Sequence, residues 1–115
     1  MKPSMRILAV TALAGASLSV MVASFRAEEK PDGAALFKQK CSMCHGPEGK
    51  GFQALKTPDF TDPKWQEGIT DKQIVETIKN GKKGTPMPSF AEKLNDDEIQ
   101  ALVAHIRSLN SDKKK

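Results

Sequence analysis

The sequence has few of the features that mark several common classes of protein. It contains only two cysteines, which excludes a scaffold held together by several disulfides. Aromatic residues make up 5% of the chain, with one tryptophan and no tyrosine, so we expect something other than protein to help fill the core. Neither sign of charge dominates, since 18 Lys and Arg stand against 14 Asp and Glu without a dense basic stripe. A nucleic-acid partner is therefore not expected.

The sequence also lacks an undiluted apolar run long enough to cross a bilayer, since Thr11, Gly15, Ser17 and Ser19 interrupt the first one. Residues 7–23 are uncharged but number 17, fewer than the roughly 20 that a membrane span needs. Two positive charges precede this run and small residues follow it, which is the pattern of a secretory signal peptide. We predict a signal peptide over residues 1–24, cleaved after Ser24, and a periplasmic domain over residues 25–115 with no stable membrane insertion after cleavage. A retained membrane anchor is the alternative.

The rest of the sequence predicts helices joined by loops, with no internal repeat and no strand of clean alternation. The helices are expected over residues 33–40, 70–80 and 96–109, with caps at Asp32, at Thr70 or Asp71, and at Asn95. The last helix has one apolar stripe, formed by Ile99, Leu102, Val103, Ile106 and Leu109. Loops are predicted over residues 46–63, with room for a turn of helix, and over residues 82–89, and a solvated tail over residues 111–115.

A Cys-x-x-Cys-His motif occupies residues 41–45. Its two thiols can each add to one vinyl group of a haem, and the adjacent histidine then approaches the iron from the same side. A thioredoxin-like redox pair would be expected beside a βαβ pattern, which is absent. A zinc site would need two further ligands, of which only His105 is a candidate, and a disulfide would close a very small, strained loop. We therefore predict one haem c attached through Cys41 and Cys44, with His45 as an iron ligand.

The second iron ligand is inferred by elimination. Haem irons that transfer electrons usually keep both axial positions filled, often by His and Met. Once the predicted signal peptide is removed, the methionines are Met43, inside the motif on the His45 side, and Met87. Met87 lies between two prolines in a stiff loop, so we predict that it is the distal ligand. The alternatives are that Met87 only fills a gap in the core, and that His105 binds iron rather than packing against the apolar stripe.

These features resemble the small, single-haem cytochromes c of the soluble bacterial electron-carrier type. The resemblance covers residues 33–109 and rests on the Leu36-Phe37 pair, the motif followed by Gly46, the Pro58-Asp59-Phe60 and Trp65 stretch, the Met87 loop and the last helix. It implies an all-α fold in which three to four helices and long loops wrap around one covalently attached haem. The first and last helices would cross, and one haem edge would be exposed. The chain departs from the family at His105, where many relatives carry tyrosine, and in its short loop between His45 and Thr70.

Two further residues are predicted to serve the haem. The Pro58 carbonyl resembles the family's acceptor for the second N–H of the ligand histidine, which orients the ring. Trp65, the only indole, is predicted to donate its N–H to a haem propionate, with a plain core tryptophan as the alternative. The nearby lysines form either a weak docking rim or a solvated surface; they are Lys38, Lys40, Lys79, Lys82 and Lys83.

The predicted function is electron transfer by an iron that cycles between Fe(III) and Fe(II) with His/Met ligation. The partners would be redox proteins, one donor and one acceptor. No catalytic residues are predicted, because no Ser/His/Asp set or carboxylate pair suggests a substrate site. Two alternatives remain open. One is a cytochrome c subunit of a larger periplasmic oxidoreductase or respiratory complex, and the other is a haem enzyme or gas sensor with an open iron.

Overall fold

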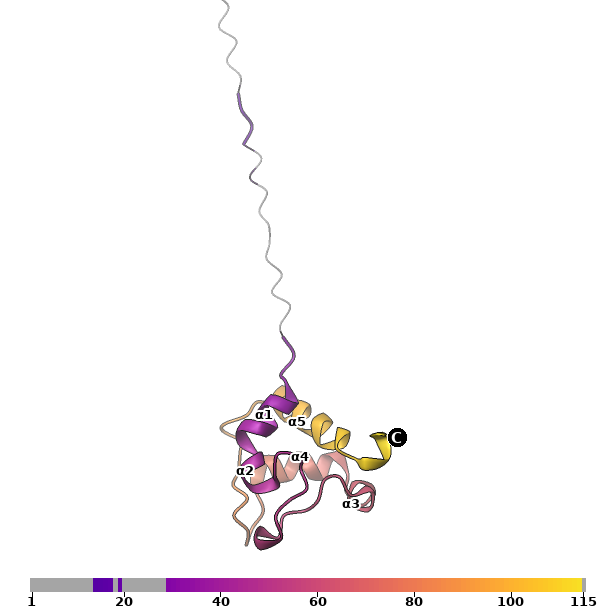
Figure 1. Cartoon of the computed structure of the whole chain (residues 1–115). Helices are drawn as coiled ribbons and strands as arrows, with labels where there is room; N and C mark the ends of the chain where they lie inside the picture. The colour runs from indigo at the N-terminus through magenta and orange to yellow at the C-terminus, as the bar shows by residue number, and fades with distance from the viewer. Residues whose placement is uncertain (1–13, 18, 20–28, 115) are drawn as a thin grey trace, which may run out of the picture.

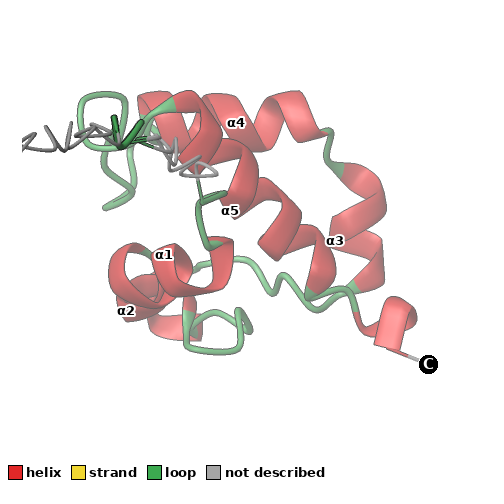
Figure 2. Cartoon of the chain, turned by 90° about the horizontal axis from the view of Figure 1, so that it is seen from above, coloured by secondary structure: helices red, strands yellow, loops and turns green. Residues whose placement is uncertain are grey.

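The computed structural model describes residues 14–17, 19 and 29–114, and most of the predicted signal peptide lies outside them. Within this part of the chain there are helices and loops but no strand (Figure 2). The helices are α1 (Gly33–Lys40), α2 (Ser42–His45), α3 (Pro63–Gly68), α4 (Asp71–Asn80) and α5 (Asp96–Ser108), with 3-10 turns η1 (Gln53–Leu55) and η2 (Ser111–Lys114). No helix among the described residues is long and apolar enough to cross a membrane. The predicted all-α fold is confirmed.

The three longer helices, α1, α4 and α5, begin at the predicted caps. The Asp32 carboxylate accepts hydrogen bonds from the first backbone N–H groups of α1 at 3.0 and 3.1 Å. Thr70 and Gln73 form a capping box at the start of α4, and Asn95 and Glu98 form another at the start of α5. Each cap satisfies backbone donors that would otherwise lack partners, and typically contributes about 1 kcal/mol.

Helices α1 and α4 both pack on α5, and Figure 1 shows α1 and α4 beside it. The backbones of α1 and α5 approach so closely that a Cβ on Gly33 would lie 2.1 Å from the carbonyl oxygen of Ala101. All five residues of the predicted α5 stripe are buried, as expected. The core comprises Phe37, Phe60, Ile74, Ile78, Phe90, Leu94, Ile99, Leu102, Val103, Ile106 and Leu109. The first and last helices, α1 and α5, therefore pack directly against each other.

Short helical segments occur in the motif, in and just after the first predicted loop, and in the predicted tail, and η1 agrees with the turn of helix expected in that loop. Helices α2 and α3 have four and six residues, too few to show a 3.6-residue apolar period. The start of α3 does carry a local signal, since Pro63 is at its first position and the Asp62 carboxylate accepts from the Lys64 backbone N–H at 3.0 Å. The predicted solvated tail is exposed over residues 111–113 and forms η2, and its Ser111 N–H donates to the Thr61 carbonyl at 3.0 Å.

Candidate haem-binding site

The Cys-x-x-Cys-His motif forms a tight turn at the end of α1. Cys41 is the C-cap residue of α1 and the N-cap residue of α2. Its carbonyl accepts hydrogen bonds from the backbone N–H groups of Cys44 at 3.2 Å and His45 at 2.9 Å. Both thiols are free and half-buried. Burial, with a smaller contribution from Cys44, raises the pKa of the Cys41 thiol to about 11, so this thiol is protonated at neutral pH. The turn gathers two thiols and one imidazole within five residues.

The His45 side chain packs face to face with an aromatic ring. Its imidazole stacks on Phe60 with ring centroids 4.7 Å apart and planes inclined by 23°. Burial lowers the pKa of His45, so the ring is neutral at neutral pH and keeps a lone pair available for a metal. Its Nδ1 atom is buried and has no hydrogen-bond partner. Leaving a buried polar atom without a hydrogen bond costs about 1–3 kcal/mol of stability. The imidazole is therefore a candidate to bind a ligand or to gain a hydrogen-bond partner.

The predicted bond from His45 to the Pro58 carbonyl is not formed in this structure, since Nδ1 has no partner. The two residues are nevertheless linked through Gly51. The Gly51 N–H donates to the His45 carbonyl at 2.8 Å, and a Cβ on Gly51 would lie 2.8 Å from the Pro58 oxygen. Gly51 has a φ of +76°, which favours glycine, so the close approach depends on it. The role of Pro58 as acceptor stays a prediction.

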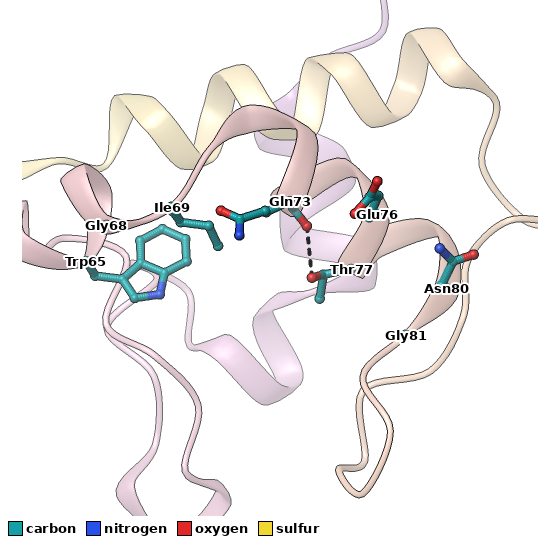
Figure 3. A pocket seen from close by; sticks show the side chains of 8 residues that line it. All are labelled: Trp65, Gly68, Ile69, Gln73, Glu76, Thr77, Asn80 and Gly81. Atoms are coloured by element: carbon teal, nitrogen blue, oxygen red, sulfur yellow. Dashed lines mark hydrogen bonds between the residues drawn. The ribbon is translucent and has the colours of Figure 1, made fainter.

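Trp65 lies at the edge of a cavity of about 540 Å³ between α3 and α4. Figure 3 shows the indole facing the side chains of Gln73 and Thr77 across this space, with Gly81 at the far end of α4. The full lining is Trp65, Gly68, Ile69, Gln73, Glu76, Thr77, Asn80 and Gly81. Of the predicted site residues, Trp65 alone lines this cavity. It is half-buried and packs on Phe60, with ring centroids 4.7 Å apart, so it connects the cavity to the His45 stack.

Met87 lies on a loop that is tied to the end of α4. The Lys82 N–H donates to the Met87 carbonyl at 3.2 Å, and the Met87 N–H donates to the Thr85 hydroxyl at 3.3 Å. Beyond the loop, the Phe90 N–H donates to the Ile78 carbonyl at 2.9 Å. The Met87 side chain is half-buried and packs against the core. The loop is therefore held at both ends, while iron ligation by Met87 stays a prediction.

Two other predicted residues have clear structural surroundings. His105 lies on α5 and packs against Phe37 with ring centroids 5.1 Å apart, which agrees with the packing role. Lys79, one of the five lysines of the predicted docking rim, forms an ion pair with Asp96 at 2.7 Å. Lys82 is exposed, as are the other three. The ion pair is exposed, and the docking rim stays a prediction.

The sequence analysis missed the central position of Phe60 and the roles of two polar residues. Phe60 contacts both His45 and Trp65 and also packs edge-on against Phe37 with centroids 6.2 Å apart. Gln66 and Arg107 bind the backbone next to these rings. The Pro58-Asp59-Phe60 pattern gave a hint of the role of Phe60. Nothing in the local sequence indicated the roles of Gln66 and Arg107.

The residues present suit a haem better than a bare metal ion. Across the described residues, no group of three or more His, Cys, Asp and Glu side chains is placed to hold a metal ion, which removes support for the zinc alternative. A neutral, half-buried imidazole, whose Nδ1 is buried and unpaired, adjoins two free thiols. Thiols are the groups that covalent haem attachment uses, and imidazole is a haem-iron ligand. Comparison with known proteins gives the same answer. The family model described as cytochrome c oxidase, cbb3-type, subunit III matches residues 28–106. The chain belongs to this family.

Individual relatives agree with this membership. The cbb3-type cytochrome c oxidase subunit FixP of Bradyrhizobium diazoefficiens is 35% identical over 81 residues, which cover 70% of this chain but only 28% of that protein. Among solved structures, the c-type cytochrome KustC0563 is 35% identical with a TM-score of 0.65, over 69% of this chain and 98% of that one. Cytochrome cL from Hyphomicrobium denitrificans is 31% identical with a TM-score of 0.59, over 70% of this chain and 47% of that one.

This member of the cbb3-type subunit III family is a small single-haem cytochrome c, as its sequence predicted, and its cofactor is haem c. It is an electron-transfer domain of the all-α cytochrome c fold. The chain spans about a quarter of the length of the FixP relative, so membership describes this domain and not the whole of that protein.

Proposed function

We propose that this cytochrome is a one-electron carrier whose haem is attached by Cys41 and Cys44 and ligated by His45 and Met87. The observation that carries the proposal is the stacked, neutral His45 imidazole beside two free thiols. The bound haem supplies the Fe(III)/Fe(II) couple. The chain itself provides attachment, ligands and an apolar surrounding, and we infer no catalytic residues of its own.

Each part of the site has a role that follows from its surroundings. Phe60 covers one face of the His45 ring and keeps water from it. Trp65 faces the cavity with an N–H donor suited to a haem propionate. The Met87 loop is tied to α4, so the thioether would stay in place during a change of iron charge. Ligands that move little on a change of iron charge keep the reorganisation energy of electron transfer small. Such a site suits electron transfer rather than substrate chemistry.

Attachment and export are tested together by maturation. Expression of the full chain with a haem-attachment system should give a red periplasmic protein whose haem survives acid–acetone extraction. Its mass should equal residues 25–115 plus one haem. The double variant Cys41→Ala, Cys44→Ala should lose the colour and most of the folded structure, because haem binding is coupled to folding. Colour that is extracted from the wild type would refute covalent attachment, and a mass that retains Met1 would refute signal cleavage.

Ligation by Met87 is tested by spectroscopy. The ferric protein should show the weak far-red band of a thioether–iron bond, and Met87→Ala should abolish it and let carbon monoxide bind the reduced iron. Met87→His should keep six ligands and exclude carbon monoxide but lower the reduction potential, because imidazole favours Fe(III) more than a thioether does. A far-red band that persists in Met87→Ala would assign the ligand elsewhere. Carbon monoxide binding by the wild type would favour the open-iron alternative.

A second candidate function is favoured by the comparisons. The family description and the FixP relative both name a cbb3-type oxidase, which suggests that this domain passes electrons to or within such a complex. Purification of the tagged full chain from native membranes and from periplasm distinguishes the two. Recovery with oxidase subunits would indicate a complex subunit, and recovery as a separate periplasmic protein would indicate a free carrier with redox partners.

A further inference from the structure

Gln66 is the buried polar side chain among the described residues, with 6% of its surface exposed. Its Nε2 donates to two backbone carbonyls from distant segments, Phe60 at 2.7 Å and Ile106 at 2.9 Å. Its Oε1 accepts from the Arg107 Nη1 at 3.1 Å. The amide is thus bonded at both ends, and it joins the residue that stacks on His45 to the last helix.

Arg107 extends this network along the same segment. Its Nη1 donates to the Gln66 carbonyl at 2.6 Å, and its Nη2 donates to the Ile69 carbonyl at 2.6 Å. Its Nε donates to Asp71 at 2.7 Å, forming an ion pair. One guanidinium group therefore donates hydrogen bonds to carbonyls at the end of α3 and forms an ion pair with the first residue of α4. Because α3 has only six residues, it depends on such tertiary bonds to keep its position.

The network lies directly behind the aromatic rings of the site. Gln66 holds the backbone of Phe60, whose ring stacks on the His45 imidazole. Trp65 precedes Gln66 in α3 and packs on the same Phe60 ring. The hydrogen bonds of Gln66 and Arg107 therefore also fix the cavity wall that Trp65 forms. A shift of α3 away from α5 would move both rings together.

We propose that Gln66 and Arg107 are positioning residues for the haem: they hold Phe60 and Trp65 against the site, and through Phe60 they set the plane of the His45 imidazole and its shielding from water. The inference rests on the proposed role of His45 as iron ligand. Fixing the ring and excluding water are means by which a protein tunes a haem potential without supplying a ligand.

The test compares matched variants of the full-length holoprotein. Gln66→Met keeps the length of the side chain and removes its three hydrogen bonds, to the Phe60 and Ile106 carbonyls and from Arg107. Gln66→Glu keeps an acceptor for Arg107 and removes only the donors to the two carbonyls. Both should change the order or spacing of the haem methyl hyperfine shifts in the ferric NMR spectrum, because these shifts report the plane of the axial imidazole. Both should also lower the reduction potential, since water that reaches the site favours the more charged Fe(III) state.

Asn95→Ala is the control for simple loss of stability. It removes the cap at the other end of α5 and should lower the unfolding midpoint while leaving the methyl shifts and the potential unchanged. If Gln66→Met lowers only the unfolding midpoint, the network is merely structural and the proposal is overturned. If that variant does not mature, Arg107→Lys decides by the same two readouts. A wild type that fails to attach haem would refute the proposed function instead.

Discussion

Gly33→Ala should destabilise the holoprotein, because α1 and α5 approach each other too closely at this point for a side chain. The new Cβ would lie 2.1 Å from the Ala101 carbonyl oxygen and 2.7 Å from its carbon. Contacts under 3.0 Å are essentially never seen for real Cβ atoms, so the helices must separate by about 1 Å. Both neighbouring atoms belong to the backbone, so no change of rotamer relieves the clash.

The size of the effect follows from two opposing contributions. Overpacking of this kind typically costs about 1–3 kcal/mol. Replacing glycine by alanine in a helix returns about 0.5–1 kcal/mol through backbone entropy. We therefore expect a net loss of about 1 kcal/mol, and at most about 2.5 kcal/mol, in the free energy of unfolding. Each kcal/mol lowers the Tm of a domain of this size by about 4–8 °C. The loss also bears on the site, because α1 leads directly into Cys41.

Denaturant unfolding of the ferric holoprotein, followed by far-UV circular dichroism, measures this change. Ala34→Ser is the matched control, since it alters one side chain in the same turn of α1 at an exposed position. That variant should stay within about 0.5 kcal/mol of the wild type. A Gly33→Ala protein as stable as the wild type, or more stable, would show that α1 and α5 do not cross at this distance and would refute the reasoning.

Two further predictions concern the cavity and the surface. Gly68 lines the cavity, and a Cβ built on it would meet nothing within 4 Å. Gly68→Leu should therefore place its side chain in the cavity and lower the yield of covalently bound haem in periplasmic extracts. An unchanged yield would mean that the cavity is not part of the haem site. Reversing the exposed Lys82 and Lys83 to glutamate should slow electron transfer to an acidic partner by up to about tenfold at low salt and flatten its salt dependence, because charges are screened within about 8 Å at physiological ionic strength. Lys113→Glu, on the exposed tail, is the control, and identical stopped-flow kinetics in all three proteins would favour a merely solvated surface.

The starts of α1, α4 and α5 were readable from the sequence because a local interaction sets each of them. Asp32, Thr70 and Asn95 each bond to backbone N–H groups two or three residues ahead, so the signal and its partner share one short window. The apolar stripe of α5 was readable for the same reason, since its period repeats over 13 residues. Helices α2 and α3 were missed because four and six residues do not establish a period.

The candidate site divides in the same way. Cys41, Cys44 and His45 are adjacent in the chain, so their chemistry was visible at once, and the haem c cofactor that they indicated is confirmed by the family. The structure places Trp65 beside a cavity, whereas it does not form the predicted bond to the Pro58 carbonyl. Those two relations depend on how loops fold back, and a motif does not specify that.

Sequence alone determined the helical class, the attachment motif and the methionine proposed as second ligand, because residue type and spacing carry that information. Tertiary structure alone decided that Gln66 joins Phe60 to α5 and that Arg107 holds the end of α3. Arg107 is 41 residues from Gln66 in the chain, and many other acceptors were equally plausible partners for it. Only the packing of α5 against the segment before α4 brings these groups within hydrogen-bond distance while excluding the water that would otherwise compete for them.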